Sequence, residues 1–138
     1  MYLLDTNVIS ELRKAKSGKA NSNVIEWAQS ISLTNFFVSV ITILELEIGI
    51  LQRERKDKKQ GQILRKWLND SVLPTFNERI LSLDVDVAQV CAKLHIPNPK
   101  SERDAIIAAT ALVHNMTIVT RNTKDFAKTD VRLLNPWK

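Results

Sequence analysis

The chain has 138 residues, 44% of them hydrophobic, which is enough for one ordinary domain with its own core, and we expect that domain to span residues 1–138. Its 20 Lys and Arg residues against 15 Asp and Glu give a net charge of +5 and a pI near 9.5, typical of nucleic-acid-binding proteins but also of proteins that are merely basic and soluble. A single cysteine excludes an internal disulfide, and without a signal peptide or an apolar run near the roughly 18 residues of a membrane span, we expect a cytoplasmic protein with no membrane contact.

Short apolar runs rich in β-forming residues alternate with longer helical patterns along the chain. The apolar runs predict strands at Tyr2–Leu4, Phe36–Val40, Ile80–Leu83, Thr117–Val119 and Val131–Leu134. The helical patterns predict helices at Val8–Arg13, Asn23–Ser30, Ile43–Lys59, Gln62–Leu73, Val85–Leu94 and Arg103–Asn115. This alternation predicts an α/β fold around a mostly parallel sheet of five strands.

Four acidic residues stand near junctions between these elements. Asp5 follows the first strand, Glu45 and Asp104 lie near the starts of two later helices, and Asp125 comes after the fourth strand. In a parallel sheet the C-terminal ends of strands and the N-termini of the following helices share one edge, so all four carboxylates can point into one crevice. The helix of Asp104 is apolar nearly all round, and a charge on so buried a helix needs a partner.

Each carboxylate also has a purely structural interpretation, which is helix capping. The candidate caps are Asp5 or Thr6 for the first helix, Thr42-x-x-Glu45 as a capping box, and Ser101-x-x-Asp104 as a looser version of that box. Capping explains each residue taken singly, but it does not explain why they converge on one edge of the sheet.

Carboxylates placed within a few ångströms of one another repel and raise one another's pKa unless a cation is bound. All-oxygen ligands favour Mg²⁺ or Mn²⁺ over zinc, and His95 and His114 fit surface or C-cap positions better than a metal site. Such a metal activates water for phosphodiester hydrolysis. Three glycines cannot form a Gly-rich phosphate loop, and Cys91 fits a packed core thiol better than a nucleophile.

The segment from Arg53 to Lys66 carries seven Lys or Arg residues against two acids. One interpretation is a solvated helix face with ion pairs such as Arg53 to Asp57. The other is a rim that contacts substrate phosphates, helped by the cations between residues 13 and 19.

Taken together, these residues resemble the PIN-domain nucleases, and within them the VapC-type toxins of bacterial toxin–antitoxin pairs in their FitB-like branch. The resemblance covers the entire chain, and it follows five motifs in order: Leu3-Leu4-Asp5-Thr6-Asn7-Val8-Ile9-Ser10-Glu11, Ser39-x-x-Thr42-x-x-Glu45-Leu46-x-x-Gly49, Asp104-x-x-Ile107-Ala108-Ala109-Thr110-Ala111, Thr117-x-Val119-Thr120-Arg121-Asn122-x-x-Asp125-Phe126 and Asn135-Pro136-Trp137. It implies an α/β/α sandwich, Mg²⁺- or Mn²⁺-dependent cleavage of RNA, and a homodimer. It also implies a cognate antitoxin whose C-terminal segment lies across the toxin groove, in a heterotetramer or larger assembly.

The resemblance also assigns roles by position. It makes Asp5, Glu45 and Asp104 the catalytic and metal-binding acids. It places the hydroxyls of Thr6 and Thr120 at the edge of the site, with Arg121 or Lys124 available to a substrate phosphate.

The fourth acidic position departs from the family pattern. Many relatives carry an acid directly after the Thr-Arg pair, where this chain has Asn122. Asp125 can substitute for it as a ligand, or it can instead cap its own turn. Asn122 offers a neutral oxygen or a water-mediated ligand.

Competing functions fit the sequence less well. A haloacid-dehalogenase-type phosphatase requires an acid two residues after the first-strand Asp, where this chain has Asn7, and a response-regulator receiver requires an acidic pair at that strand. A catalytically silent PIN fold that binds RNA, or forms half of a DNA-bound repressor complex, is the serious alternative, against which the complete set of Asp5, Glu45 and Asp104 argues. Ile48, Leu51, Trp67 and Leu68 are surplus apolar residues that dimer contacts or core packing explain equally well.

Overall fold

The computed structural model describes all 138 residues, and five strands run among seven α-helices. The strands are β1 (Tyr2–Leu4), β2 (Phe36–Ser39), β3 (Ile80–Leu81), β4 (Thr117–Val119) and β5 (Leu133–Leu134). The α-helices are α1 (Thr6–Arg13), α2 (Ser22–Gln29), α3 (Val40–Lys56), α4 (Lys58–Trp67), α5 (Leu73–Thr75), α6 (Val85–Leu94) and α7 (Glu102–Val113). The short 3-10 segments are η1 (Lys14–Ser17), η2 (Leu33–Asn35) and η4 (Thr123–Phe126), and η3 (Leu68–Val72) is a π-helical turn.

The sheet has the order β3-β2-β1-β4-β5, and every pair of neighbouring strands is parallel. Tyr2 pairs with Phe36 on one side of β1 and with Thr117 on the other. The prediction of a five-stranded parallel sheet is therefore confirmed. Because β1 lies at the centre, the residues that follow β1, β2 and β4 all emerge at the same edge of the sheet.

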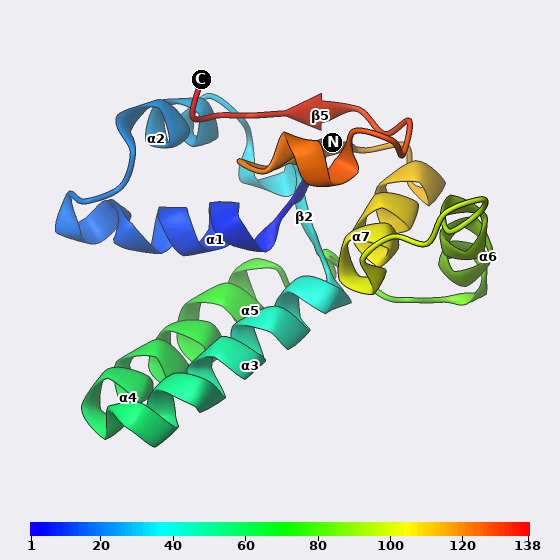
Figure 1. Cartoon of the computed structure of the whole chain (residues 1–138). Helices are drawn as coiled ribbons and strands as arrows, with labels where there is room; N and C mark the ends of the chain where they lie inside the picture. The colour runs from blue at the N-terminus through cyan, green and yellow to red at the C-terminus, as the bar shows by residue number, and fades with distance from the viewer.

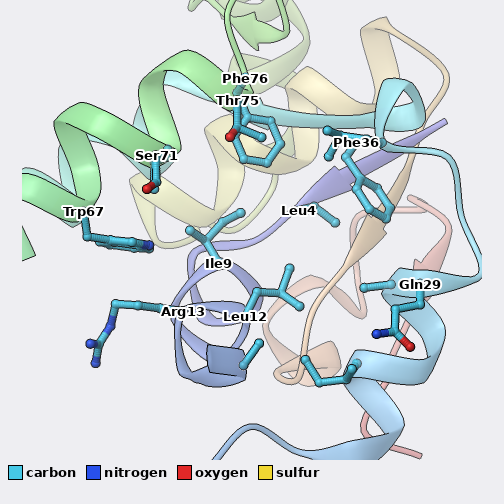
Figure 2. Close-up of a pocket in the computed structure, with 15 residues that line it drawn as sticks. Leu4, Ile9, Leu12, Arg13, Gln29, Phe36, Trp67, Ser71, Thr75 and Phe76 are labelled. Atoms are coloured by element: carbon cyan, nitrogen blue, oxygen red, sulfur yellow. The ribbon is translucent and has the colours of Figure 1, made fainter. Parts of the chain in front are cut away.

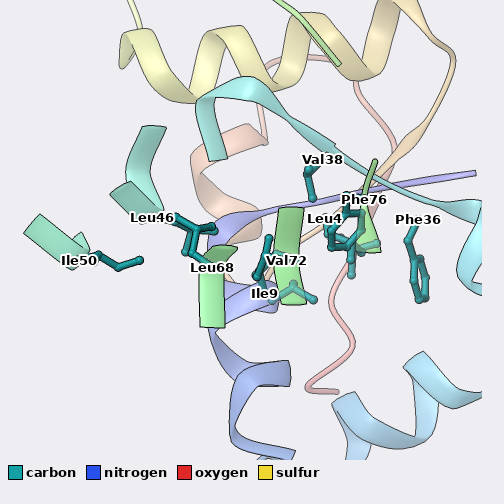
Figure 3. Close-up of a cluster of buried hydrophobic side chains, with 11 residues drawn as sticks. Leu4, Ile9, Phe36, Val38, Leu46, Ile50, Leu68, Val72 and Phe76 are labelled. Atoms are coloured by element: carbon teal, nitrogen blue, oxygen red, sulfur yellow. The ribbon is translucent and has the colours of Figure 1, made fainter. Parts of the chain in front are cut away.

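The sheet divides the core in two, because consecutive strand residues point to opposite faces. Leu4 and Val119 join a cluster completed by apolar residues of α1, α3 and η3, which Figure 3 shows. Leu3 and Ile118 join a second cluster formed mainly with α7 and η4. In Figure 1, α1, α2 and the pair α3 and α4 lie on one side of the strands, and α6 and α7 lie on the other. The fold is thus the expected α/β/α sandwich.

The region of α3 and α4 differs from the prediction of a helix over Ile43–Lys59. The chain breaks at Asp57, whose extended backbone (φ −148°) ends α3 and whose side chain caps α4 by accepting the N–H of Gln60. That capping replaces the expected ion pair with Arg53. Arg65 instead joins the two helices, with Glu47 at 2.7 Å and Glu54 at 3.4 Å, so part of the basic segment is an ion-paired helix face.

Gly61 explains how closely α3 and α4 approach each other. A Cβ added at this position would lie 2.6 Å from the Cα of Glu54, closer than packed atoms tolerate. Only glycine allows α4 to lie this near α3. The C-terminal half of α3, the long helix that carries Glu45, is thereby packed closely against α4.

Other element boundaries were predicted less accurately. Both edge strands are shorter than predicted: β3 ends at Leu81 rather than Leu83, and β5 begins at Leu133 rather than Val131. The predicted helix over Gln62–Leu73 changes to a π-helical turn at Leu68, where its apolar side chains enter the core. No helix has both the length and the apolar character needed to cross a bilayer.

Candidate active site

Asp5 lies at the middle of the sheet edge, directly after β1, and is only 8% exposed. It is the N-cap of α1: its Oδ1 accepts the backbone N–H of Thr6 at 2.9 Å. Its Oδ2 accepts the hydroxyl of Thr120 at 2.8 Å. Burial raises the pKa of Asp5, these two hydrogen bonds oppose the rise, and the charges of Glu45 and Asp125 add to it. Capping and membership of an acidic cluster are therefore both true of this residue.

Glu45 lies in the second turn of α3, the helix that follows β2, and its charge acts on Asp5 from the neighbouring strand's side of the sheet edge. The capping-box prediction for it is wrong, because Ser39 is the N-cap and its Oγ accepts the N–H of Ile41 at 3.0 Å. The Thr6 hydroxyl donates instead to Glu45 Oε1 at 2.6 Å, and Thr42 Oγ1 lies 3.2 Å from the same hydroxyl. Thr6 therefore ties the start of α1 to α3.

Asp104 is the third residue of α7, a helix buried along most of its length. The pKa of Asp104 is raised to about 6, first by burial and then by the charges of Asp125, Asp5 and Glu45. Ser101 occupies the N-cap position, but its side chain makes no capping hydrogen bond. The charges of three carboxylates from other parts of the chain therefore act on Asp104. We call Asp5, Glu45, Asp104 and Asp125 the carboxylate group.

Asn122 and Asp125 are the two candidates for the fourth acidic position of the site, and both residues are exposed. Asp125, on η4, raises the pKa of Asp5 and of Asp104 through its charge, so it lies within electrostatic range of both. Asn122 contributes its backbone, which donates to Thr120 Oγ1 at 3.0 Å, and its side chain does not cap η4. These observations support Asp125 rather than Asn122 as the fourth acidic residue.

Asn7 belongs to the site although the sequence did not single it out as a functional residue. Its Nδ2 donates to Asp5 Oδ2 at 3.3 Å and to Thr120 Oγ1 at 3.2 Å, and its Oδ1 accepts the backbone N–H of Arg121 at 3.2 Å. It therefore holds the loop after β4 against Asp5. Its position two residues after Asp5, in the first motif, was the available signal.

Arg103 is the second residue that the sequence did not reveal. Its Nη1 lies 3.7 Å from Glu45 Oε2, while its side chain remains half exposed. An exposed ion pair of this kind contributes less than about 1 kcal/mol to stability. Its physical effect is to place one cation beside the carboxylate group. Nothing in the spacing of Arg103 predicts a contact with α3.

The predicted phosphate contacts are exposed beside the carboxylate group. Arg121 and Lys124 line a polar hollow together with Asp125, and neither cation forms an ion pair. The two histidines lie elsewhere, as the C-cap residues of α6 and α7, which confirms that prediction. Cys91 is only partly buried, 3.9 Å from the His95 ring, so the expectation of a packed core thiol is wrong.

The donor chemistry of the carboxylate group fits a hard divalent cation, because the donors are oxygens and because burial, together with their mutual repulsion, raises the pKa of Asp5 and Asp104. No three His, Cys, Asp or Glu side chains are grouped tightly enough to hold one ion jointly. Mg²⁺ is commonly bound by one or two carboxylates, with water and substrate phosphate completing its shell. The arrangement thus fits a partly hydrated ion rather than one enclosed by protein.

The chain is similar to known proteins over its whole length. Toxin FitB from Neisseria gonorrhoeae is 37% identical over 142 residues, covering 99% of each chain. VapC ribonuclease Y4jK from Sinorhizobium fredii is 34% identical over 143 residues, covering all of this chain and 99% of the relative. The crystal structure of FitAcB from Neisseria gonorrhoeae superimposes with a TM-score of 0.88 at 37% identity, covering 99% of each chain. Residues 2–132 match the family described as PIN domain, and the chain belongs to that family.

Proposed function

We propose that the chain is a metal-dependent endoribonuclease that acts as the toxin of a toxin–antitoxin pair, as a single domain spanning residues 1–138 in the cytoplasm. One observation carries this proposal: carboxylates from four distant segments lie close enough at one edge of the sheet for their charges to raise the pKa of Asp5 and Asp104, beside the cations Arg121 and Lys124, which form no ion pair. The names of the relatives, a toxin and a VapC ribonuclease, support both halves of the proposal.

Asp5, Glu45 and Asp104 are the proposed metal ligands, with Asp125 completing the carboxylate group. Bound Mg²⁺ or Mn²⁺ would supply an activated water and neutralise charge on the phosphodiester. Thr120 and Asn7 hold Asp5 Oδ2, and Thr6 holds Glu45 Oε1, so both carboxylates are oriented before any ion arrives. Arg121 and Lys124 are placed to bind the phosphate of the RNA on the side of η4.

The test is purified protein incubated with diverse single-stranded and structured RNAs in Mg²⁺ or Mn²⁺. Cleavage should require the ion, stop with EDTA, and be lost in the Asp5→Ala variant. Cleavage that survives Asp5→Ala would place the activity elsewhere or in a contaminant. If the folded protein cleaves none of the RNAs, the chain is instead a silent PIN fold that binds RNA or works in a DNA-bound repressor complex.

The proposed antitoxin contact is an apolar groove of about 380 Å³ between α1, α2 and the segment from η3 to α5. Figure 2 shows Ile9 and Leu12 of α1 facing Phe36 and Phe76 across it. Leu33 lies on its rim with 52% of its surface exposed. An extended or helical segment with apolar side chains would bury this surface, as helix-in-groove complexes do.

A proposed homodimer contact lies on α3. Val40, Leu44 and Leu51 are all exposed, and their spacing places them on one face of the helix. Of the apolar residues that the sequence offered as dimer contacts, Leu51 fits this face and Leu68 does not, because Leu68 is fully buried. A homodimer of this kind, with antitoxin on each groove, gives a heterotetramer or larger.

A further inference from the structure

A second hollow lies next to the carboxylate group, between the loop after β4 and the C-terminal residues. Its volume is about 530 Å³, within the range of about 300–1,000 Å³ that small-molecule sites occupy. Asp125 lines it, so it is continuous with the carboxylate group. Trp137 is the one hydrophobic residue in its wall, and the other lining residues are polar or charged.

The side chains that line this hollow carry a net positive charge. They include Arg121, Lys124 and Lys138, and Asp125 is the one acidic side chain among them. None of these three cations belongs to any of the four ion pairs of the protein, whereas Arg65 on α4 is paired with two carboxylates. Unpaired cations around a concave surface favour an anionic ligand.

An aromatic platform stands in the same wall. The guanidinium carbon of Arg121 lies over the Trp137 ring, 5.5 Å from its centroid. The backbone of Trp137 is held at both ends: its N–H donates to Asn135 Oδ1 at 3.0 Å, and its carbonyl accepts from Asn23 Nδ2 at 3.0 Å. Nucleobases stack on aromatic rings and on Arg guanidinium planes alike, so this pair offers a fixed surface for a base.

The platform is attached to the carboxylate group through hydrogen bonds. The backbone N–H of Arg121 donates to Asn7 Oδ1, and Nδ2 of the same Asn7 side chain donates to Asp5 Oδ2. Arg121 also directly follows Thr120, whose hydroxyl donates to Asp5. A ligand on the platform is therefore held at a fixed distance from Asp5, which is what a subsite beside the reacting bond requires.

We propose that this hollow binds one nucleotide of single-stranded RNA next to the scissile phosphate. Its base stacks on the Arg121–Trp137 pair, and Lys124 and Lys138 contact its flanking phosphates. The subsite makes base preference at that position depend on stacking, so the C-terminal Trp137 takes part in choosing where RNA is cut. The inference rests on the proposed function for the nature of the substrate.

The test measures the affinity of fluorescein-labelled single-stranded RNA by anisotropy, in EDTA so that nothing is cut. Trp137→Leu should weaken binding about tenfold, the usual effect of removing a stacked base's platform, and Trp137→Phe should retain most of the affinity. Thermal unfolding of both variants shows that they are folded at the assay temperature. Lys138→Gln should lower the slope of log affinity against log salt by about 0.7, while Lys128→Gln, an exposed lysine outside the hollow, should leave it unchanged.

A set of RNAs with one abasic nucleotide at successive positions identifies the stacked base. At one position, base removal should weaken binding to the wild type about tenfold and cause no further weakening in Trp137→Leu. Additive losses at every position, or equal affinities of wild type and Trp137→Leu, would overturn the proposal. So would a Trp137→Leu variant that loses antitoxin affinity alone, because the hollow would then be a protein contact. These measurements need no cleavage, so they give their answer even if the proposed nuclease activity fails its own test.

Discussion

Replacing Asp104 by Asn should stabilise the metal-free protein at neutral pH, because the ionised carboxylate of Asp104 is held in a site that disfavours it. The pKa rises from 3.8 to about 6, a shift of about 2 units, which corresponds to at most about 3 kcal/mol. Partial exposure of Asp104 reduces this to about 1–2 kcal/mol. Loss of a negative charge near the N-terminus of α7 subtracts about 0.3–1 kcal/mol. The net expected gain is about 1 kcal/mol.

The pH dependence follows from the sign of the shift. Below pH 3.8 the carboxyl is protonated in both the folded and the unfolded chain, and its burial carries no electrostatic penalty. Between pH 3.8 and about 6 the unfolded chain releases this proton first, so the folded wild type loses stability relative to Asp104→Asn as pH rises. Above about 6 the full difference is present.

Urea unfolding in EDTA, at several pH values from 4 to 7.5, measures this difference. Glu102→Gln is the matched control, because Glu102 loses the same charge from the first turn of the same helix but is exposed and outside the carboxylate group. Adding Mg²⁺ should reverse the order, since the wild type gains more binding free energy than Asp104→Asn. A wild-type-to-variant difference that does not change with pH, or that Glu102→Gln reproduces, would refute the raised pKa that burial and the neighbouring carboxylates give Asp104.

Three further predictions concern the supporting structure. Leu33→Asp should weaken antitoxin binding at least tenfold in a pull-down titration, since the substitution places a charge in an apolar groove. Ile63→Asp, at similar exposure on α4, should leave binding unchanged. Equal effects of the two substitutions would place the antitoxin contact elsewhere. Gly61→Ala should lower the free energy of unfolding by about 1–3 kcal/mol, because the added Cβ meets the Glu54 backbone. Gly49→Ala should raise it by about 0.5–1 kcal/mol, because the added Cβ meets no atom and alanine favours the helix. The reverse order of the two free energies would contradict the packing of α4 on α3. Thr120→Val removes the hydroxyl that donates to Asp5 and should lower stability by about 1–3 kcal/mol and reduce kcat, and unchanged kcat would remove Thr120 from the site.

The sheet and the acidic core were predictable from the sequence because both depend on local patterns. Runs such as Tyr2–Leu4 and Thr117–Val119 are short, β-forming and followed by a polar residue, and they form strands with those limits. Once the strands are parallel, Asp5 must emerge at the same edge as the residues that follow β2. Glu45, Asp104 and Asp125 were singled out by their positions near element junctions, and the resemblance to a known family then assigned roles by position.

What the sequence could not give depends on contacts between distant segments. The break at Asp57 arises because its side chain caps α4, a choice that a continuous run of helix-forming residues conceals. Asn7 and Arg103 reach the site through hydrogen bonds and charge across the fold, and no spacing along the chain encodes those contacts. The same is true of the Arg121–Trp137 pair, because Arg121 lies in the loop after β4 and Trp137 lies near the C-terminus.

The central claim is that the carboxylate group binds a divalent cation, and Mn²⁺ binding measured by electron paramagnetic resonance tests it most directly. The wild type should bind Mn²⁺, and Mg²⁺ should compete for the same site. Asp5→Asn and Asp104→Asn should each weaken Mn²⁺ binding at least tenfold, while Glu102→Gln should bind it as the wild type does. Mn²⁺ binding that is equally tight in Asp5→Asn, Asp104→Asn and the wild type would contradict the account.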